Sequence, residues 1–425
     1  MIDACGVSQT KGNIAPIAFS KLVKLAAISI TAAFGGAVAS AQAADFSLPI
    51  QQAANATGVT SIRDNGSDGT GVTVGILSNS FNTTPGMNST GTVDDLNYDI
   101  SHGYLPPQNQ IQIVKESTGP LSDEGRAIGQ VIHAVAPGAK LLFYTAVNSQ
   151  SDFGNGIQAL KSAGANILVD DIQYVSEPTP PDGDINQAIN TVVNQGVNYL
   201  TSAGNNDSGV QFTPLTIYGH ASNPNAVTVG AAYEGNPTTS NFNYTGFSTT
   251  TVKQGQLEPF SKAGANSSSC STSPDRTCKP DVVGPDGIPI SFNLSGGSPS
   301  EVTNQGTFYD FFGTSASAPY TAGVAALLLQ AVPQATNSQI YAAITQTATP
   351  LDSSSGFSSS SGYGLIHADK ALTYLQQTTS VPEPSSFAGL IAFGCYYAGF
   401  LFLKRPISGD LQAKPFVVKP MTYKD

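Results

Sequence analysis

The sequence predicts an α/β fold in which helices flank a mostly parallel central sheet. Two observations carry this prediction: apolar runs of strand length recur from residue 71 onward, and segments with helical spacing lie between them. The strand patterns occupy residues 72–77, 140–146, 166–171, 197–202 and 226–232. The helical patterns place apolar residues on one face at Ile128, Val131, Ile132 and Val135, and again at Ile185, Ala188, Ile189, Val192 and Val193. Strands that alternate with helices favour a doubly wound parallel sheet.

The composition is that of a loop-rich globular protein with a low charge content. Of the 425 residues, 11% are charged, and the chain contains 43 glycines and 27 prolines. The formal net charge is −11 and no basic cluster is present, which argues against nucleic acid as a partner. An acidic, charge-poor surface suits a protein that works outside the cytoplasm.

The N-terminal 43 residues have the pattern of a signal peptide. Lys21 and Lys24 precede an apolar run at residues 25–39, and the run closes on Ala41-Gln42-Ala43, small residues of the kind that signal peptidase reads. We expect cleavage after Ala43. Residues 44–68 would then form a short N-terminal extension of the exported protein.

The C-terminal region carries a second export-related pattern at residues 379–405. Val381-Pro382-Glu383-Pro384 leads into an apolar stretch at residues 387–403, which is just long enough to span a bilayer and is followed by Lys404-Arg405. This arrangement resembles a PEP-CTERM sorting signal, which implies processing by an exosortase-type enzyme and transient membrane association. A plain membrane anchor is the alternative interpretation. Such signals usually stop soon after the basic pair, whereas here a tail at residues 406–425 follows.

Two of the four cysteines fall in the expected mature domain. Cys5 precedes the cleavage site and Cys395 lies in the apolar C-terminal stretch, so Cys270 and Cys278 remain and are able to form a small disulfide loop in an oxidising compartment. No histidine or further cysteine stands near them at the spacing of a zinc site. The loop acids Asp94, Asp95 and Asp99 lack a diagnostic calcium spacing, and we expect no metal or cofactor.

The segment 313–319, Gly-Thr-Ser-Ala-Ser-Ala-Pro, indicates a nucleophile at the start of a helix. Ser315 is flanked by small residues and precedes an almost wholly apolar helical run that continues to Gln330. The free N–H groups and the dipole at a helix N-terminus stabilise negative charge, so they favour an oxyanion forming beside Ser315. An ordinary buried helix with a Ser or Thr cap is the alternative interpretation of a lone Gly-Thr-Ser string.

Four further polar clusters stand at predicted strand ends or helix starts. They are residues 78–80 (Ser-Asn-Ser), 122–127 (Ser-Asp-Glu-Gly-Arg-Ala), Asp170-Asp171 and 202–205 (Ser-Ala-Gly-Asn). In parallel sheets the binding site lies beyond the carboxyl ends of the strands, so these clusters are expected to converge with Ser315. A nucleophile, a base, an orienting group and an oxyanion donor are what acyl transfer requires.

Three of these motifs resemble those of the subtilisin-like peptidases. The strings at residues 313–319, 202–205 and 279–285 match that family, and the likeness covers a domain that we place at residues 69–378. The resemblance implies a three-layer subtilisin-like fold, protein or peptide substrates, Ser315 as the nucleophile and Asn205 as a side-chain donor to the oxyanion.

The family's usual base, a histidine, is replaced in this chain. The corresponding string is Glu124-Gly125-Arg126, so Glu124 is the predicted general base, similar to the Ser-Glu arrangement of the sedolisins. His133 lies nine residues further along the same helix, about 13 Å away on roughly the opposite face. The position of the sedolisin helper carboxylate, four residues after the glutamate, holds Ile128.

The family's orienting aspartate is also replaced, by Asn79. Its amide can donate a hydrogen bond to Glu124, which orients the carboxylate and keeps it ionised, whereas an aspartate there would share a proton with it. Asp171 takes the family's cleft-lining position, with Asp170 beside it. Either Asp171 supplies the missing negative charge, or Asp170 and Asp171 form a loop-capping pair.

Two functions follow from these observations. The first is an exported serine endopeptidase, at the cell surface or outside the cell, with possible inner-membrane anchoring before the C-terminus is processed. The second is a catalytically impaired protein of the same fold that binds peptides at the surface or in a matrix, because a retained cleft can hold a peptide by strand pairing.

Overall fold

The computed structural model describes residues 46–84, 86–87, 93–206, 216–235, 239–242, 250–265, 268–294, 299–351 and 356–379. The chain divides into units at residues 1–375 and 376–425, and the architecture below belongs to the first. The expected signal peptide and almost all of the expected sorting segment lie outside the described residues. Within the described ranges, no helix has the length and apolar character needed to cross a membrane.

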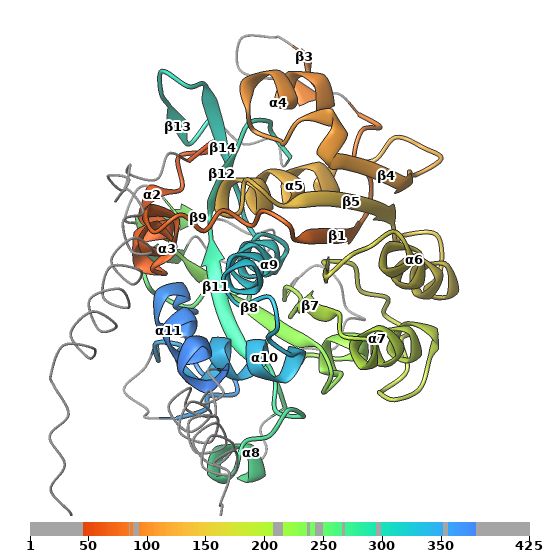
Figure 1. The fold of residues 1–425 in the computed structure, drawn as a ribbon, viewed down its shortest axis with the longest axis vertical. Helices are drawn as coiled ribbons and strands as arrows, with labels where there is room; N and C mark the ends of the chain where they lie inside the picture. Colours follow the sequence, from red (N-terminus) through yellow and green to blue (C-terminus); the bar gives the residue numbers. More distant parts are fainter. Residues whose placement is uncertain are drawn as a thin grey trace, which may run out of the picture. The chain divides into compact units, whose positions relative to one another are not determined.

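A seven-stranded sheet in which every pairing is parallel forms the centre of the domain (Figure 1). The strand order is β11-β8-β7-β6-β1-β5-β4. The strands are β1 (Thr73–Ser78), β4 (Ile111–Lys115), β5 (Lys140–Thr145), β6 (Ile167–Asp170), β7 (Asn198–Ser202), β8 (Val227–Tyr233) and β11 (Val282–Asp286). The predicted class, an α/β fold with a mostly parallel sheet, is confirmed.

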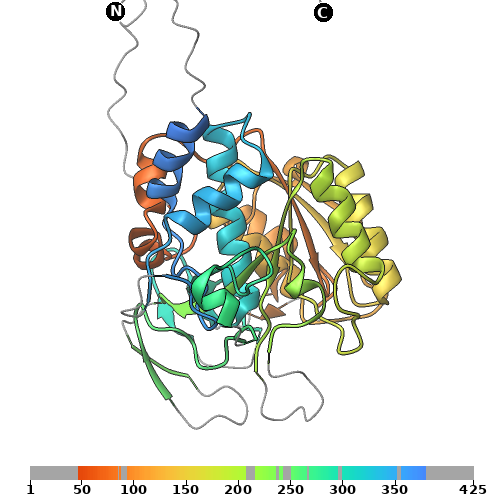
Figure 2. The ribbon, with the colours of Figure 1, turned by 90° about the horizontal axis from the view of Figure 1, so that it is seen from below.

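Helices cover both faces of this sheet and make three layers (Figure 2). On one face, α5 (Glu124–Val135) and α9 (Thr314–Ala331) pack on alternate strand residues such as Val74, Ile76 and Phe143. On the other face, α6 (Gln150–Ser162) and α7 (Asp184–Asn194) pack on the intervening residues, among them Leu142, Leu168 and Tyr199. Successive side chains of a strand point to opposite faces, which is why near-continuous apolar strands are found at the middle of three layers.

Residues 46–64 pack into the same core as the sheet and α9. They form α2 (Gln51–Ala56) and α3 (Val59–Asp64), with Leu48 and Ile50 buried ahead of them. The Thr57 hydroxyl lies 2.8 Å from the Tyr320 hydroxyl of α9. The described part of the expected N-terminal extension is therefore packed as part of the domain.

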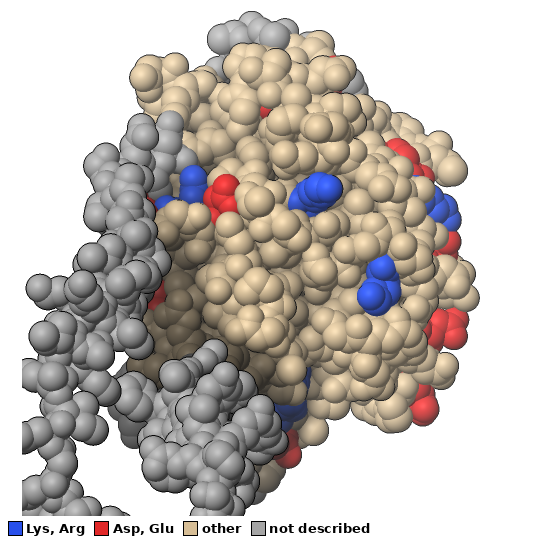
Figure 3. Space-filling view, in the orientation of Figure 1, with Lys and Arg blue, Asp and Glu red and all other residues tan. Residues whose placement is uncertain are grey.

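The remaining elements are short or lie at the edges of the domain. The helices are α4 (Leu96–His102), η1 (Gln108–Gln110), η2 (Gly219–Ser222), α8 (Ser268–Thr272), α10 (Asn337–Gln346) and α11 (Ala368–Thr379). The strands are β2 (Gly86–Met87), β3 (Val93–Asp94), β9 (Thr239–Phe242), β10 (Thr250–Lys253), β12 (Ile288–Ile290), β13 (Glu301–Val302) and β14 (Thr307–Phe311). A disulfide joins Cys270 and Cys278, whose Cα atoms are 5.6 Å apart. On the face shown in Figure 3, the Lys and Arg side chains are sparse, and some of them lie beside Asp or Glu side chains.

Candidate active site

The polar side chains singled out in the sequence converge at the carboxyl edge of the sheet. Asn79 directly follows β1, Asp171 directly follows β6, and Asn205 lies three residues after β7. Glu124 is the first residue of α5 and Ser315 the second of α9. The parallel order of the strands thus brings residues from five segments to one edge, as the sequence predicts.

Asp123 anchors the start of α5. Its backbone adopts a left-handed conformation with φ 56°, and its buried carboxylate accepts hydrogen bonds from the Ser80 hydroxyl at 2.8 Å and from the backbone N–H of Thr84 at 3.0 Å. Gly125 lets the helix approach this loop closely, because a Cβ there would lie 2.7 Å from the Ser80 carbonyl oxygen. These contacts fix the backbone on either side of Glu124.

Arg126 holds the same helical turn from the other side. Its fully buried Nη1 donates to Asp94 Oδ1 at 2.8 Å and to Asp99 Oδ2 at 2.6 Å. Its guanidinium also lies 3.9 Å from the ring centroid of Phe292. Burial and the neighbouring Asp99 raise the pKa of Asp94 to about 7. Two of the loop acids that lack a calcium spacing are therefore partners of Arg126.

Asn79 contacts Glu124 through both ends of its amide. Oδ1 accepts a hydrogen bond from the Glu124 backbone N–H at 3.0 Å, and Nδ2 lies 3.4 Å from Glu124 Oε2. Nδ2 also donates to the Ser122 hydroxyl at 2.7 Å. Since its oxygen holds a backbone N–H, the amide nitrogen must face the carboxylate.

The Glu124 carboxylate meets Ser315 and Asp171. Burial raises its pKa, while hydrogen bonds with the Asp171 side chain and with the Ser315 hydroxyl act in the opposite direction. Glu124 retains partial solvent exposure as a residue. The hydroxyl of the expected nucleophile thus lies within hydrogen-bond reach of the expected base.

Asp171 is the second carboxyl group of the site. Both of its oxygens are buried, and among the described residues they accept no hydrogen bond of ordinary length from an N–H or hydroxyl donor. Burial, followed by the negative charge of Glu124, raises the pKa of Asp171 well above its ordinary value, and the nearby Ser78 hydroxyl opposes this. Two adjacent buried carboxyls do not both ionise readily, so the ionised form of Glu124 opposes ionisation of Asp171.

Asp170, which the sequence groups with the cleft, is instead fully buried on the opposite side of β6. Its Oδ1 lies 3.0 Å from His220 Nε2, and the other ring nitrogen of His220 lies 2.6 Å from Glu177 Oε2. Although burial lowers the pKa of His220, the charges of Asp170 and Glu177 outweigh it and raise that pKa to about 10. Asp170 therefore belongs to a structural ion cluster, and only Asp171 of the pair faces the site.

Asn205 is held so that its amide nitrogen faces the nucleophile segment. Oδ1 accepts hydrogen bonds from the Thr314 backbone N–H at 3.0 Å and from the Thr314 hydroxyl at 3.1 Å. A Cβ on Gly313 would lie 3.1 Å from Nδ2 and 3.8 Å from the Ser315 Cβ, so the glycine leaves open the space between them. Ser315 itself is 8% exposed.

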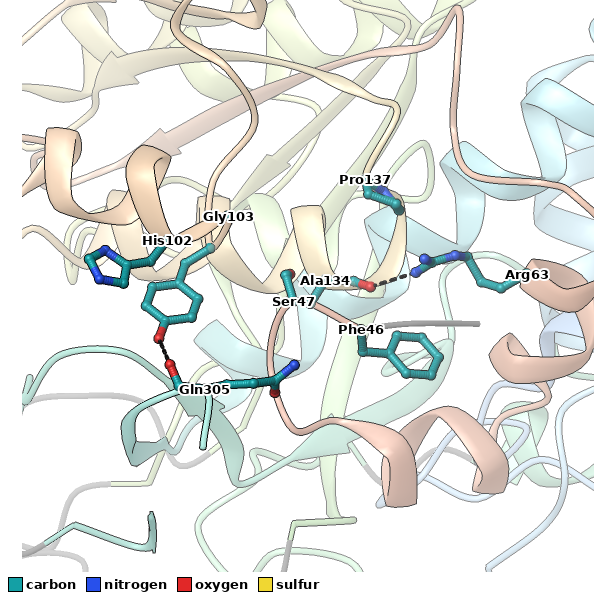
Figure 4. Close-up of a pocket in the computed structure, with 9 residues that line it drawn as sticks. Phe46, Ser47, Arg63, His102, Gly103, Ala134, Pro137 and Gln305 are labelled. Carbon is teal, nitrogen blue, oxygen red and sulfur yellow. Dashed lines mark hydrogen bonds between the residues drawn. The ribbon is translucent and has the colours of Figure 1, made fainter. Parts of the chain in front are cut away.

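A separate cavity of about 360 Å³ lies at the far end of α5 (Figure 4). Arg63 donates to the Ala134 carbonyl oxygen at its edge at 2.9 Å, and Tyr104 donates to the Gln305 carbonyl oxygen at 2.6 Å. Ala134 is ten residues from Glu124, or about 15 Å along the helix axis. This cavity does not belong to the site at the sheet edge.

Several residues of the site were not predicted from the sequence. Neither the roles of Asp123 and Arg126 nor the cluster around His220 has a motif of its own. The doubled acid at Asp170-Asp171 was a visible signal, but only the alternation of a strand tells which of the two faces the site. Among the residues that the structure describes, no group of three or more acidic, His or Cys side chains is placed to hold a metal ion.

Comparison with known proteins agrees with this architecture. The model of the subtilase family matches residues 69–364. The chain is 26% identical to subtilisin Savinase of Lederbergia lenta over 316 residues, covering 72% of this chain and 92% of that protein. It is also 26% identical to an alkaline protease of Alkalihalobacillus alcalophilus, of which it spans 65%.

Two solved structures illustrate the likeness of the fold. Fervidolysin of Fervidobacterium pennivorans, a keratinolytic enzyme related to subtilisin, has a TM-score of 0.51 and 20% identity over 76% of this chain and 45% of its own. MycP1 of Mycobacterium smegmatis has a TM-score of 0.51 and 18% identity over 77% of this chain and 86% of its own. The parallel sheet, the edge where Ser315 lies and the match across residues 69–364 lead to one conclusion: the chain belongs to the subtilase family of serine peptidases.

Proposed function

We propose that this subtilase is an exported serine endopeptidase that cleaves peptide bonds through an acyl-enzyme on Ser315, with Glu124 as the general base. The observation that carries the proposal is the proximity of the Ser315 hydroxyl to the Glu124 carboxylate, close enough for the hydroxyl to lower the pKa of Glu124. This pair lies beside an amide of Asn205 whose oxygen is already occupied by Thr314. A nucleophile, a base and an oxyanion donor therefore share one edge.

In the first half of the reaction, Glu124 takes the proton of the Ser315 hydroxyl as Oγ attacks the peptide carbonyl carbon. The oxyanion receives hydrogen bonds from Asn205 Nδ2 and the Ser315 backbone N–H, and the N-terminus of α9 adds its positive end. Glu124 then passes the proton to the leaving amine nitrogen, the C–N bond breaks, and an ester on Ser315 remains.

The second half repeats these proton transfers with water. Glu124 takes a proton from the water that attacks the ester, and returns it to Ser315 Oγ as the C–O bond breaks. The product acid leaves and the hydroxyl is restored. Asn79 keeps Glu124 oriented throughout, because one end of its amide holds the Glu124 backbone and the other faces its carboxylate.

Asp171 supplies the second carboxyl group beside Glu124 that an aspartate at position 79 would otherwise supply. It shares a proton with Glu124, so that the pair carries one negative charge before substrate binds. The raised pKa of Glu124 makes it a stronger base than an ordinary glutamate and brings its titration closer to neutral pH. The rate is expected to rise with pH through a pKa above the ordinary glutamate value of 4.5.

Export rests on the two ends of the sequence. We propose that signal peptidase removes residues 1–43 and that an exosortase-type enzyme processes residues 379–405, so that the peptidase acts on protein or peptide substrates at the cell surface or outside the cell. The relatives that the chain resembles include an alkaline protease and a keratinolytic enzyme, which supports protein substrates.

Labelling with a fluorescent fluorophosphonate tests the nucleophile and the base separately. The purified full chain is expected to bind one label, and Ser315→Ala is expected to bind none. Glu124→Gln retains the size of the side chain but cannot take a proton, so its labelling rate is expected to fall by about 10²–10⁴-fold, the usual contribution of a general base. Absence of labelling and of hydrolysis of fluorescent casein in the unmodified chain would contradict the proposal and support a peptide-binding protein.

A further inference from the structure

A second pair of buried carboxyl groups lies behind the nucleophile segment. Asp286 is the last residue of β11 and is fully buried, and Glu258 is only 1% exposed. Glu258 lies beside β8, where its backbone N–H donates to the Ala231 carbonyl oxygen at 2.9 Å. Asp286 pairs with Tyr233 of the same strand. The two acids therefore approach one another across the end of β8, close enough for each side chain to affect the pKa of the other.

Asp286 is joined directly to the nucleophile segment. Its Oδ1 accepts a hydrogen bond from the Gly313 backbone N–H at 2.8 Å, two residues before Ser315. Gly313 has φ 118°, a value that residues with a side chain rarely adopt. The intrinsic preference of the backbone therefore does not fix this turn, and contacts with its neighbours must do so. The carboxylate of Asp286 is thus the fixed point from which the turn into α9 starts.

Among the described residues, the Glu258 carboxyl has no neighbour other than Asp286 that explains its burial. Both of its carboxyl oxygens, and Oδ2 of Asp286, are buried without an N–H or hydroxyl donor among the described residues. Two buried carboxylates facing one another without donors would repel strongly, whereas a proton between them makes a hydrogen bond. Because the N–H groups of Gly313 and Gly287 both point to Asp286, negative charge is better placed there and the proton is better placed on Glu258.

We propose that Glu258 and Asp286 are positioning residues for the nucleophile, and that the proton they share keeps Asp286 in place as the acceptor that sets the Gly313–Ser315 backbone. This inference rests on the proposed role of Ser315, and it assigns no contact between the pair and the substrate. Ionisation of both groups would drive them apart, release the Gly313 N–H and disturb the space between Asn205 and Ser315.

Other titratable groups on the same elements do not interfere with this pair. Burial raises the pKa of Glu234 at the end of β8 to about 7, and burial lowers the pKa of Lys262, four residues after Glu258, to about 8. Neither contributes to the pKa of Glu258 or Asp286, which are raised first by their own burial. From α9, the ring of Tyr320 is affected by Glu234 and not by the pair.

Hydrogen exchange of the backbone amides in the segment 313–318, followed by mass spectrometry of the full chain, tests the proposal without requiring catalysis. Exchange is compared near pH 6, below the raised pKa of Glu258 of about 7, and near pH 9, after correction for the intrinsic rates. In the unmodified chain, protection of this segment is expected to fall at least about tenfold at the higher pH. Glu258→Gln keeps a permanent donor to Asp286 and is expected to retain the protection at both values.

Two further variants complete the test. Asp286→Ala removes the acceptor and is expected to lose protection of the segment already at pH 6. The control Asp152→Asn, which alters a partly exposed carboxylate paired with Lys115, is expected to behave as the unmodified chain. Equal exchange in the unmodified chain and Glu258→Gln at the higher pH would overturn the proposal. Normal protection of the segment in Asp286→Ala would also overturn the proposal. If Asp286→Ala does not fold, the exchange of Glu258→Gln at the higher pH is sufficient to test it.

Fluorophosphonate labelling of the same samples links the segment to reactivity. Glu258→Gln is expected to keep its neutral labelling rate and to hold it at the higher pH, where the rate of the unmodified chain falls. Asp286→Ala is expected to label at least about tenfold more slowly at neutral pH, as misplacement of a reacting group implies. If the exchange results hold while no variant is labelled, the pair still positions the segment and the proposed peptidase function fails instead.

Discussion

Asn79 binds the backbone and the side chain of Glu124 at once: its Oδ1 accepts the Glu124 backbone N–H at 3.0 Å, and its Nδ2 lies 3.4 Å from Glu124 Oε2. An aspartate in its place would keep the first contact and lose the second, because a carboxylate offers no N–H. It would also add a third acid to the pair formed by Glu124 and Asp171.

We therefore predict that Asn79→Asp raises the pKa of the carboxyl cluster and slows the reaction at acid pH. The acid limb of the fluorophosphonate labelling rate, measured from about pH 4 to pH 9, is expected to move to higher pH by about one unit, as a new like charge nearby implies. A severalfold gain in rate at every pH would instead mean that Asn79 is a degraded orienting residue.

Asp171→Asn is expected to have the opposite effect on the acid limb. The amide replaces a carboxyl that can itself ionise by a permanent hydrogen-bond donor, which favours the charged form of Glu124, so the pKa of Glu124 falls and the base becomes weaker. We expect the acid limb to move to lower pH and the rate at neutral pH to fall by about tenfold or more. A profile identical to that of the unmodified chain would show that Asp171 does not share a proton with Glu124.

Asn205→Ala is expected to reduce turnover rather than binding. Loss of one oxyanion donor costs about 10²–10³-fold in kcat, and the ground-state carbonyl benefits little from that donor. The measurement is steady-state hydrolysis of a fluorogenic peptide, with KM expected to change less than about threefold. A large rise in KM with unchanged kcat would assign Asn205 to substrate binding.

His220 gives the fold a pH dependence that is separate from that of the site. Its folded pKa of about 10 exceeds the ordinary value of 6.5, so its contribution to the free energy of unfolding is fully present below the ordinary pKa and is lost as pH rises through about 10. We predict that His220→Gln unfolds at lower temperature at pH 6, by the equivalent of about 3–5 kcal/mol, because Asp170 and Glu177 lose their buried cation.

The measurement is thermal unfolding of both chains between about pH 6 and pH 10, and the difference in unfolding temperature is expected to shrink as pH rises. A difference that is constant with pH would show that His220 is neutral in the folded protein. The surface variant Asp152→Asn serves again as the control, because its partner Lys115 is partly exposed.

The sheet was largely predictable because its strands are short apolar runs buried on both faces. Each predicted strand agrees with an observed one to within a residue or two at either end. Neither edge strand was predicted. In β4 only Ile111 of the five residues is buried and the run carries a polar Gln112, whereas Gly284 and Pro285 interrupt the apolar run of β11. The helix α6 was missed because glycines and polar residues interrupt its apolar face, with Phe153, Ile157 and Leu160 alone forming the stripe.

The site was predictable only where a motif carries it. Ser315, Asn205 and Glu124 stand in recognisable strings, but what surrounds them depends on contacts between residues far apart in the chain. Glu258 and Asp286 meet across a strand that belongs to neither, and no spacing in the sequence reports that contact. Asp170 was assigned to the cleft, and burial beside His220 overrides that assignment.

In the first turn of α5, the residues that hold the backbone in place are different from the residue that acts as the base. Asp123 ties the turn to the loop after β1, Arg126 ties it to α4, and neither side chain takes part in proton transfer. The side chain at position 124 can change while the backbone that presents it stays where it is. With this arrangement, evolution or protein engineering can replace the base at position 124 by an imidazole or a carboxylate while the surrounding backbone contacts are kept.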